Sequence, residues 1–135
     1  MDRRSFLITA AVASVLPLAG WAAPLEYTPG LVKEHLAKGE VVFLDFKAQW
    51  CGTCKTQERV INDLKAANPA YEQKIRFINV DWDTYGEADI TKEMAIPRRS
   101  TLVVLKGDQE LDRLVAATGK ADIQGLMDTA LAAAQ

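Results

Sequence analysis

Apolar and polar residues follow two different periods along this chain. Val41–Phe46 and Thr101–Lys106 are short, nearly continuous apolar runs, a pattern typical of strands buried on both faces. Ile75–Val80 alternates weakly and indicates a third strand. Leu111–Val115 follows the second apolar run after a Gly-Asp turn, so these two segments predict a hairpin.

The segments between these strands carry apolar residues at helical spacing. Helices are predicted from Leu31 to Gly39, from Thr53 to about Asn68 and over Glu87–Ala95. A last helix opens at Thr118-Gly119. Its apolar stripe consists of Ile123, Leu126, Met127, Ala130, Leu131 and Ala134. Strands and helices in this order indicate a single α/β domain.

The first 22 residues have the composition of an export signal. An apolar stretch from Leu7 to Gly20 is too short for a comfortable transmembrane helix, and small residues at Gly20 and Ala22 suit a signal peptidase. We expect residues 1–22 to be a signal peptide that is cleaved after Ala22, leaving residues 23–135 as the domain. An uncleaved membrane anchor is the alternative.

The residues before this stretch bear on the export route. Arg3-Arg4-Ser5-Phe6-Leu7 resembles the twin-arginine export motif. Asp2 and Ile8 depart from the usual pattern, which leaves a Sec-type signal open. Either route predicts a periplasmic protein.

Composition narrows the class of protein further. The chain has 135 residues, of which 49% are hydrophobic and 25% charged, as in an ordinary globular domain. Its net charge of −2 gives no sign of a nucleic-acid binder. Its two cysteines stand in one short motif, so they do not form a disulfide scaffold.

That motif lies between the end of a predicted strand and the start of a predicted helix. Trp50-Cys51-Gly52-Thr53-Cys54-Lys55 places two cysteines at the start of the helix. Free N–H groups and the helix dipole favour a thiolate there, and the thiolate is the reactive form of cysteine. We expect Cys51 to attack a substrate disulfide and Cys54 to resolve the mixed disulfide, leaving a Cys51–Cys54 disulfide.

The segment from Asp45 to Lys55 resembles the active-site segment of the thioredoxin family, in which an aspartate precedes W-C-G-x-C-K at this distance. The resemblance extends from Leu31 to the C-terminus. It implies a thioredoxin fold with a central mixed sheet flanked by helices, and a monomeric thiol–disulfide oxidoreductase that acts on disulfide-bearing proteins without a cofactor. A zinc site is disfavoured because structural zinc needs four ligands, and the chain has no second cysteine pair and one histidine, His35.

Asp45 is a polar residue within an otherwise apolar strand. A buried carboxyl group resists ionisation and can take up protons near neutral pH. The resemblance implies that Asp45 helps to deprotonate Cys54. The alternative is a solvated aspartate at the end of the strand.

The chain departs from the family at one position. The family has a cis-proline directly before the strand that matches Thr101–Lys106, and a gapless alignment puts Ser100 there. A rearranged loop that restores Pro97 to this role is the alternative, and the Arg99–Ser100 bond is either cis or trans. The resemblance implies a substrate groove around this loop and the motif, formed by Trp50, Gly52, Thr53, Arg99, Ser100 and Thr101.

Two further departures concern charge. Arg98 and Arg99 flank the loop, and either would favour a thiolate and draw acidic substrates if it pointed at Cys51. Lys47 stands where the family often has an aromatic residue, and we expect a solvated lysine there. We expect His35 to lie on a helix surface or to be partly packed, without a role in the chemistry.

The residues that follow the second cysteine bear on the direction of electron flow. Cys54-Lys55-Thr56-Gln57-Glu58 has the C-K-x-x-E pattern of the C-terminal thioredoxin-like domains of membrane disulfide reductases. This similarity favours a periplasmic reductase supplied by an inner-membrane thiol electron donor. The alternatives are a disulfide oxidase or isomerase, a dithiol metal-binding module permitted by Ser100, and a non-enzymatic adaptor.

Overall fold

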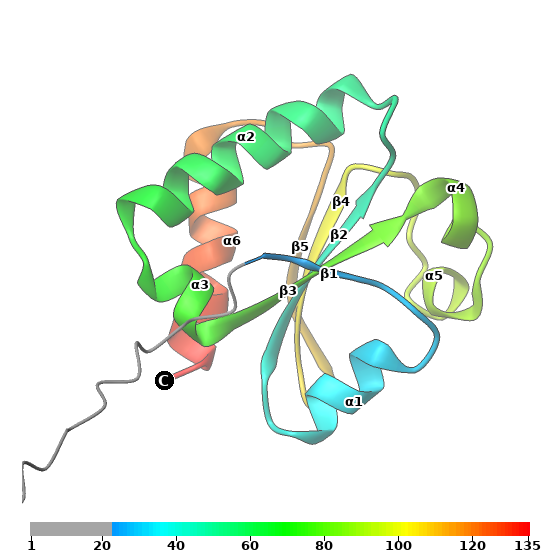
Figure 1. Cartoon of the computed structure of the whole chain (residues 1–135), viewed down its shortest axis with the longest axis horizontal. Coiled ribbons are helices and arrows are strands. Elements are labelled where there is room, and N and C mark those ends of the chain that lie inside the picture. Colours follow the sequence, from blue (N-terminus) through cyan, green and yellow to red (C-terminus); the bar gives the residue numbers. More distant parts are fainter. Residues whose placement is uncertain (1–22) are drawn as a thin grey trace, which may run out of the picture.

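The computed structural model describes residues 23–135 and arranges them as a central sheet with helices on both faces (Figure 1). The expected signal peptide, its cleavage after Ala22 and the twin-arginine motif lie outside the described residues. Within residues 23–135, no helix is long and apolar enough to cross a membrane.

The sheet has five strands in the order β1-β3-β2-β4-β5. The central strand β2 (Val41–Lys47) pairs parallel with β3 (Ile75–Asp81) and antiparallel with β4 (Thr101–Lys106). At one edge the short β1 (Leu25–Glu26) pairs parallel with β3, and at the other edge β5 (Gln109–Val115) pairs antiparallel with β4. The mixed sheet is therefore the one that the thioredoxin fold requires.

Helices cover both faces of this sheet (Figure 1). On one face lie α2 (Gly52–Ala67), α3 (Ala70–Lys74) and α6 (Lys120–Ala133). On the other face lie α1 (Leu31–Ala37), α4 (Trp82–Tyr85) and α5 (Asp89–Glu93). Pro69 separates α2 from α3, in agreement with the predicted end of the helix at about Asn68.

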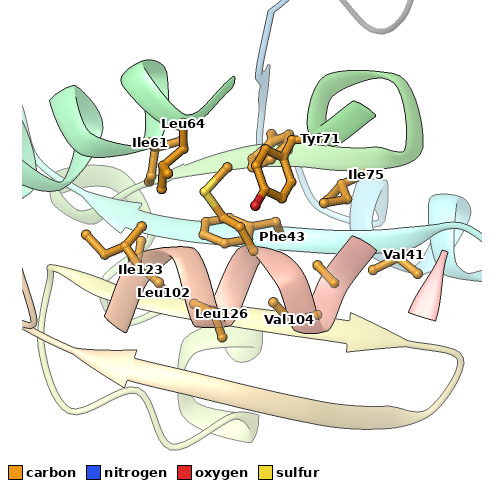
Figure 2. Close-up of a cluster of buried hydrophobic side chains, with 13 residues drawn as sticks. Val41, Phe43, Ile61, Leu64, Tyr71, Ile75, Leu102, Val104, Ile123 and Leu126 are labelled. Carbon is orange, nitrogen blue, oxygen red and sulfur yellow. The ribbon is translucent and has the colours of Figure 1, made fainter. Parts of the chain in front are cut away.

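The β2 strand is apolar throughout most of its length because it is covered on both faces. Phe43 belongs to a cluster beneath α2, α3 and α6, where it lies beside Tyr71 and Leu102 (Figure 2). Leu44, the next residue along the strand, belongs to a second cluster beneath the helices of the opposite face. Successive side chains of a strand point to opposite faces, so the apolar residues of β2 pack alternately into one cluster and the other.

Three elements differ from the sequence-based expectation. The β1 strand and the short helix α3 were not predicted, because segments of two and five residues are too short to show a period. Trp82–Tyr85 forms a single helical turn where we expected only the end of a strand. This turn matters for the site because Trp82 packs against the cluster that contains both cysteines.

Candidate active site

Cys51 and Cys54 lie at the N-terminus of α2, beyond the carboxyl end of β2. Cys51 is the N-cap residue of the helix, and the Cys54 N–H donates a hydrogen bond to Cys51 Sγ at 3.1 Å. The two residues form a disulfide with Cα atoms 5.2 Å apart. Both are almost fully buried and cluster with Ala48 and Trp82. The helix start therefore supplies a fixed donor to the first sulfur.

Ser100 lies against both sulfur atoms. Its Oγ is 3.2 Å from Cys51 Sγ and 3.1 Å from Cys54 Sγ, and the residue is completely buried. No peptide bond in residues 23–135 is cis, so the Arg99–Ser100 bond is trans, and Ser100 takes the left-handed region with φ +66°. Pro97 is exposed on the same loop. The structure thus places Ser100, as in the gapless alignment, next to the dithiol.

The backbone of Ser100 is held from three sides. Its N–H donates to Phe46 O at 2.7 Å, and its carbonyl accepts from Ala116 N at 2.9 Å. The Gln57 side-chain amide donates both to this carbonyl and to Ala117 O, each at 3.0 Å. Gln57 is completely buried. These bonds fix the loop that carries the serine hydroxyl.

Sequence reasoning missed Gln57, although a signal for it exists. Cys54, Gln57, Ile61 and Leu64 fall at intervals of three or four residues, so they share the buried face of α2. A polar residue on such a stripe requires hydrogen-bond partners. In this protein the partners are backbone carbonyls of the segments around the active site.

Asp45 is buried on β2, which excludes the alternative of a solvated carboxylate. Burial raises the pKa of Asp45 to about 7, and Glu58 and Glu26 add to this rise, whereas Lys47 and Lys65 oppose it. Its Oδ1 has no hydrogen-bond partner within residues 23–135. No direct hydrogen bond joins Asp45 to either cysteine in this part of the chain. The carboxyl group therefore titrates near neutral pH.

A cavity of about 170 Å³ lies next to Asp45. Charged side chains of both signs line it, among them Lys47, Glu58 and Lys65. Phe43, Ile61 and Phe77 form an apolar part of its wall. A partly polar space of this size can admit water next to the buried carboxyl group.

Two lysines that line this cavity are largely enclosed. Lys47 Nζ forms an ion pair with Glu58 Oε2 at 3.1 Å, and its side chain is only 20% exposed, so the expectation of a solvated lysine was wrong. Lys65 is buried with its Nζ 3.9 Å from the centroid of the Phe77 ring, and burial lowers its pKa. No local pattern pointed to Lys65, because it comes near Asp45 only once α2 packs on the sheet.

Trp50 and Arg99 form the rim of the site. Trp50 is 58% exposed and its Nε1 donates to both carboxylate oxygens of Asp83, at 3.0 and 3.1 Å. The Arg99 guanidinium lies over the Trp50 ring at 4.4 Å from the centroid. Arg98 Nε donates to Arg99 O. Neither arginine forms an ion pair or hydrogen bond with a cysteine sulfur within residues 23–135.

The remaining expected groove residues fall into two groups. Gly52 is exposed and Thr53 is partly exposed, so both lie where a substrate can reach them. Thr101 is completely buried and its Oγ1 donates to Arg98 O at 2.7 Å, so its side chain supports the loop from within. His35 is also buried, with Nδ1 2.5 Å from Glu40 Oε2, and it takes no part in this site.

Residues 23–135 contain no cluster of three or more His, Cys, Asp or Glu side chains suited to a metal ion. The reactive groups described above are the dithiol, the serine hydroxyl beside it and the buried carboxyl group of Asp45 on β2. The two cysteines are buried at the start of a helix and can form a disulfide, and the helix packs on a mixed sheet. This combination defines a dithiol oxidoreductase of the thioredoxin fold.

Comparison with known protein families supports the same class. Residues 25–129 match the family described as Thioredoxin, and this chain belongs to the thioredoxin family. Thioredoxin 1 of Nostoc is 27% identical over 108 residues, covering 79% of this chain and 96% of the relative. Thioredoxin of Coprinus comatus is 33% identical over 94 residues, covering 70% of this chain and 84% of the relative.

Solved structures agree with this assignment. The crystal structure of Trxlp from Edwardsiella tarda is 31% identical and has a TM-score of 0.65, covering 76% of this chain and 97% of that protein. The protein is therefore a thiol–disulfide oxidoreductase with the Cys51–Cys54 pair as its dithiol.

Proposed function

We propose that this protein is a periplasmic protein-disulfide reductase whose Cys51–Cys54 dithiol is supplied with electrons by an inner-membrane thiol donor. The main support for the redox activity is the position of Cys51 at the N-cap of α2, where its Sγ accepts a hydrogen bond from the Cys54 backbone N–H. A thiolate at that position is stabilised by the helix N-terminus. Cys51 is therefore the nucleophile.

The proposed cycle moves two electrons from the dithiol to the substrate. The Cys51 thiolate attacks a substrate disulfide, forms a mixed disulfide with one sulfur and releases the other as a thiolate. The Cys54 thiol then loses its proton and attacks Cys51 Sγ. This step forms the Cys51–Cys54 disulfide and releases the second substrate thiolate.

Asp45 is the proposed acceptor for the Cys54 proton. A general base works best when its pKa lies near the operating pH, and the pKa of Asp45 is about 7. No direct hydrogen bond links the two groups within residues 23–135, so the proposed proton route passes through water. The cavity lined by Asp45 supports the part of this route between the carboxyl group and solvent.

The proposed substrate surface is the rim around the dithiol, where Trp50 and Gly52 are exposed and Arg99 is partly exposed. Among the backbone bonds of residues 23–135 outside the helices and strands, none uses the Arg99 N–H, whereas the Ser100 N–H is already bonded to Phe46 O. An extended substrate segment would therefore pair with Arg99 rather than with Ser100, as an added strand. The partners are disulfide-bearing proteins, and we expect a monomer.

The periplasmic location and the membrane donor rest on sequence alone. Their support is the signal-like composition of residues 1–22 and the C-K-x-x-E pattern that ends at Glu58. A reductase in an oxidising compartment needs electrons from across the membrane.

A trapping experiment tests this function. Cys54→Ser removes the resolving sulfur, so mixed disulfides on Cys51 should accumulate in cells that express the full chain. Cys51→Ser is the matched control and should trap nothing through the motif. We expect Cys54→Ser to capture a membrane thiol protein and periplasmic substrates. Capture of cytoplasmic proteins alone would contradict the proposal.

A second test addresses export. Arg3→Lys combined with Arg4→Lys should leave the protein in the cytoplasm if the twin-arginine route is used. The exported protein should begin at Ala23 in N-terminal sequencing. Efficient export of the double variant would favour the Sec route, and an intact N-terminus in the periplasmic fraction would contradict cleavage after Ala22.

A further inference from the structure

Ser100 presents one hydroxyl group to two redox sulfurs. Its Oγ is within hydrogen-bond distance of both Cys51 Sγ and Cys54 Sγ, at 3.2 and 3.1 Å. All three residues are buried, with at most 2% exposure. Hydrogen bonds to a charged group in such a setting are stronger than those between neutral groups.

The two sulfurs differ in their other partners. Cys51 Sγ also accepts the Cys54 N–H at 3.1 Å. For Cys54 Sγ, the Ser100 hydroxyl is the hydrogen-bond partner found within residues 23–135. Among the described residues, removal of the hydroxyl would thus leave Cys51 with one donor and Cys54 with none.

A serine hydroxyl has a single proton to donate, two lone pairs that can accept, and an O–H that rotates to suit its partners. It can therefore donate to only one sulfur at a time. When Cys51 is a thiolate and Cys54 a thiol, the favourable arrangement has Ser100 donating to Cys51 and accepting from the Cys54 S–H. Once Cys51 is in a mixed disulfide, the same O–H can turn toward Cys54.

We propose that Ser100 is a catalytic residue whose hydroxyl donates a hydrogen bond first to the Cys51 thiolate and then to the Cys54 thiolate as that sulfur resolves the mixed disulfide. No bond to oxygen forms or breaks in this role. The hydroxyl keeps its proton, and the Cys54 proton leaves to the general base.

This inference rests on the dithiol chemistry of the site and not on the location or direction proposed above. It also explains why a non-glycine residue at φ +66° occupies this position, since a hydroxyl is needed where the backbone is bonded to Phe46 O and Gln57. Glycine would fit the backbone more easily but would take the hydroxyl away from both sulfurs.

Charged groups on the segments near the active site must also be held constant in a test. They come from each element around the site: Asp45 on β2, Lys55 on α2, Asp83 on α4, and Arg98 and Arg99 on the loop. None forms a hydrogen bond or ion pair with either sulfur within residues 23–135. A substitution of Ser100 changes none of these charges, so its effect can be read directly.

Three variants separate the hydroxyl from the shape of the loop. Ser100→Ala removes the hydroxyl and keeps the left-handed strain, and Ser100→Gly removes the hydroxyl and relieves that strain. Thr101→Val is the matched control, because it removes a neighbouring buried hydroxyl that bonds to Arg98 O and not to sulfur. The Cys51 pKa is followed by the ultraviolet absorbance of its thiolate in the reduced proteins.

We expect Ser100→Ala and Ser100→Gly to raise the Cys51 pKa by a similar amount, about one unit, which is a tenfold change in the thiolate-to-thiol ratio. Loss of this stabilisation from the reduced form should shift the reduction potential by about 30 mV to more negative values. Both variants should also accumulate mixed disulfide in single turnovers, because resolution slows. Thr101→Val should leave the pKa and the potential unchanged.

Unchanged Cys51 pKa and unchanged resolution rates in both Ser100 variants would overturn the proposal. A pKa shift in Thr101→Val as large as in Ser100→Ala would also overturn it, since the effect would then be one of loop stability. If the wild-type protein itself reduced no protein disulfide in its dithiol form, the redox function would fail instead. The two failures are therefore distinguishable.

Discussion

Replacement of Asp45 by asparagine tests the electrostatics of the site through the stability of the fold. Burial raises the pKa of Asp45 from 3.8 to about 7. Between these values the folded state binds more protons than the unfolded state, so wild-type stability falls as the pH rises through that window. Asparagine has nearly the same shape and no proton to exchange. The free-energy difference between the two proteins should therefore depend on pH.

The size of this stability difference follows from the pKa shift of Asp45. About three pKa units at 1.36 kcal/mol each correspond to a wild-type destabilisation of about 4 kcal/mol above neutral pH. The uncharged amide of the Asp45→Asn variant would still be buried with an unpartnered group, which costs about 1–3 kcal/mol. Asp45→Asn should therefore be about 1–3 kcal/mol more stable than wild type at about pH 8, and no more stable than wild type at about pH 4.

Urea unfolding of the oxidised proteins at several pH values measures this difference, with the midpoint and the m-value fitted separately. Asp108→Asn is the matched control, because Asp108 is exposed on the β4–β5 turn and its replacement should give a small, constant effect. A stability difference for Asp45→Asn that stays constant between about pH 4 and about pH 8 would refute the reasoning. It would show that the carboxyl group is not held neutral by burial.

Three further predictions concern the residues around the dithiol. Gln57→Leu should lower the free energy of unfolding by about 1–3 kcal/mol in urea titrations, because Ser100 O and Ala117 O lose their shared donor; an unchanged midpoint would contradict this. Glu58→Gln should lower the Asp45 pKa and Lys47→Met should raise it, as followed by NMR of the carboxyl carbon, and equal shifts in one direction would contradict the assigned charges. Trp50→Ala should weaken reduction of protein disulfides through KM while leaving the Cys51 pKa unchanged, and a shifted pKa would mean that Trp50 acts on the thiolate instead.

Elements with a strong apolar period could be predicted from the sequence. β2, β4 and α2 matched expectation closely, because each is long enough for its pattern to repeat and each packs against the core. The two residues of β1 and the single turn of α4 carry no such repeat. Their conformations depend on pairing with β3 and on packing near the dithiol, which only the folded chain supplies.

The features of the active site also fall into those that the sequence predicts and those that depend on the fold. The cysteine motif could be recognised from local pattern alone, whereas the apolar strand around Asp45 indicated burial but left a solvated aspartate as an alternative. Three other interactions join residues of different elements, so no local sequence pattern predicts them. They are the ion pair of Lys47 with Glu58, the effect of Lys65 on the pKa of Asp45, and the hydrogen bond of Trp50 with Asp83. The sequence places Ser100 directly before β4, but its contact with both sulfurs depends on how the loop folds over the start of α2.

The reduction potential of the Cys51–Cys54 pair tests the central claim most directly. Equilibration of the protein with glutathione and with dithiothreitol, followed by separation of the oxidised and reduced forms, gives this value. The account predicts a potential near about −270 mV, as for a thioredoxin-like reductant. A potential near roughly −120 mV would make the protein an oxidant and contradict the proposed direction, and failure to form the disulfide at all would contradict its dithiol chemistry.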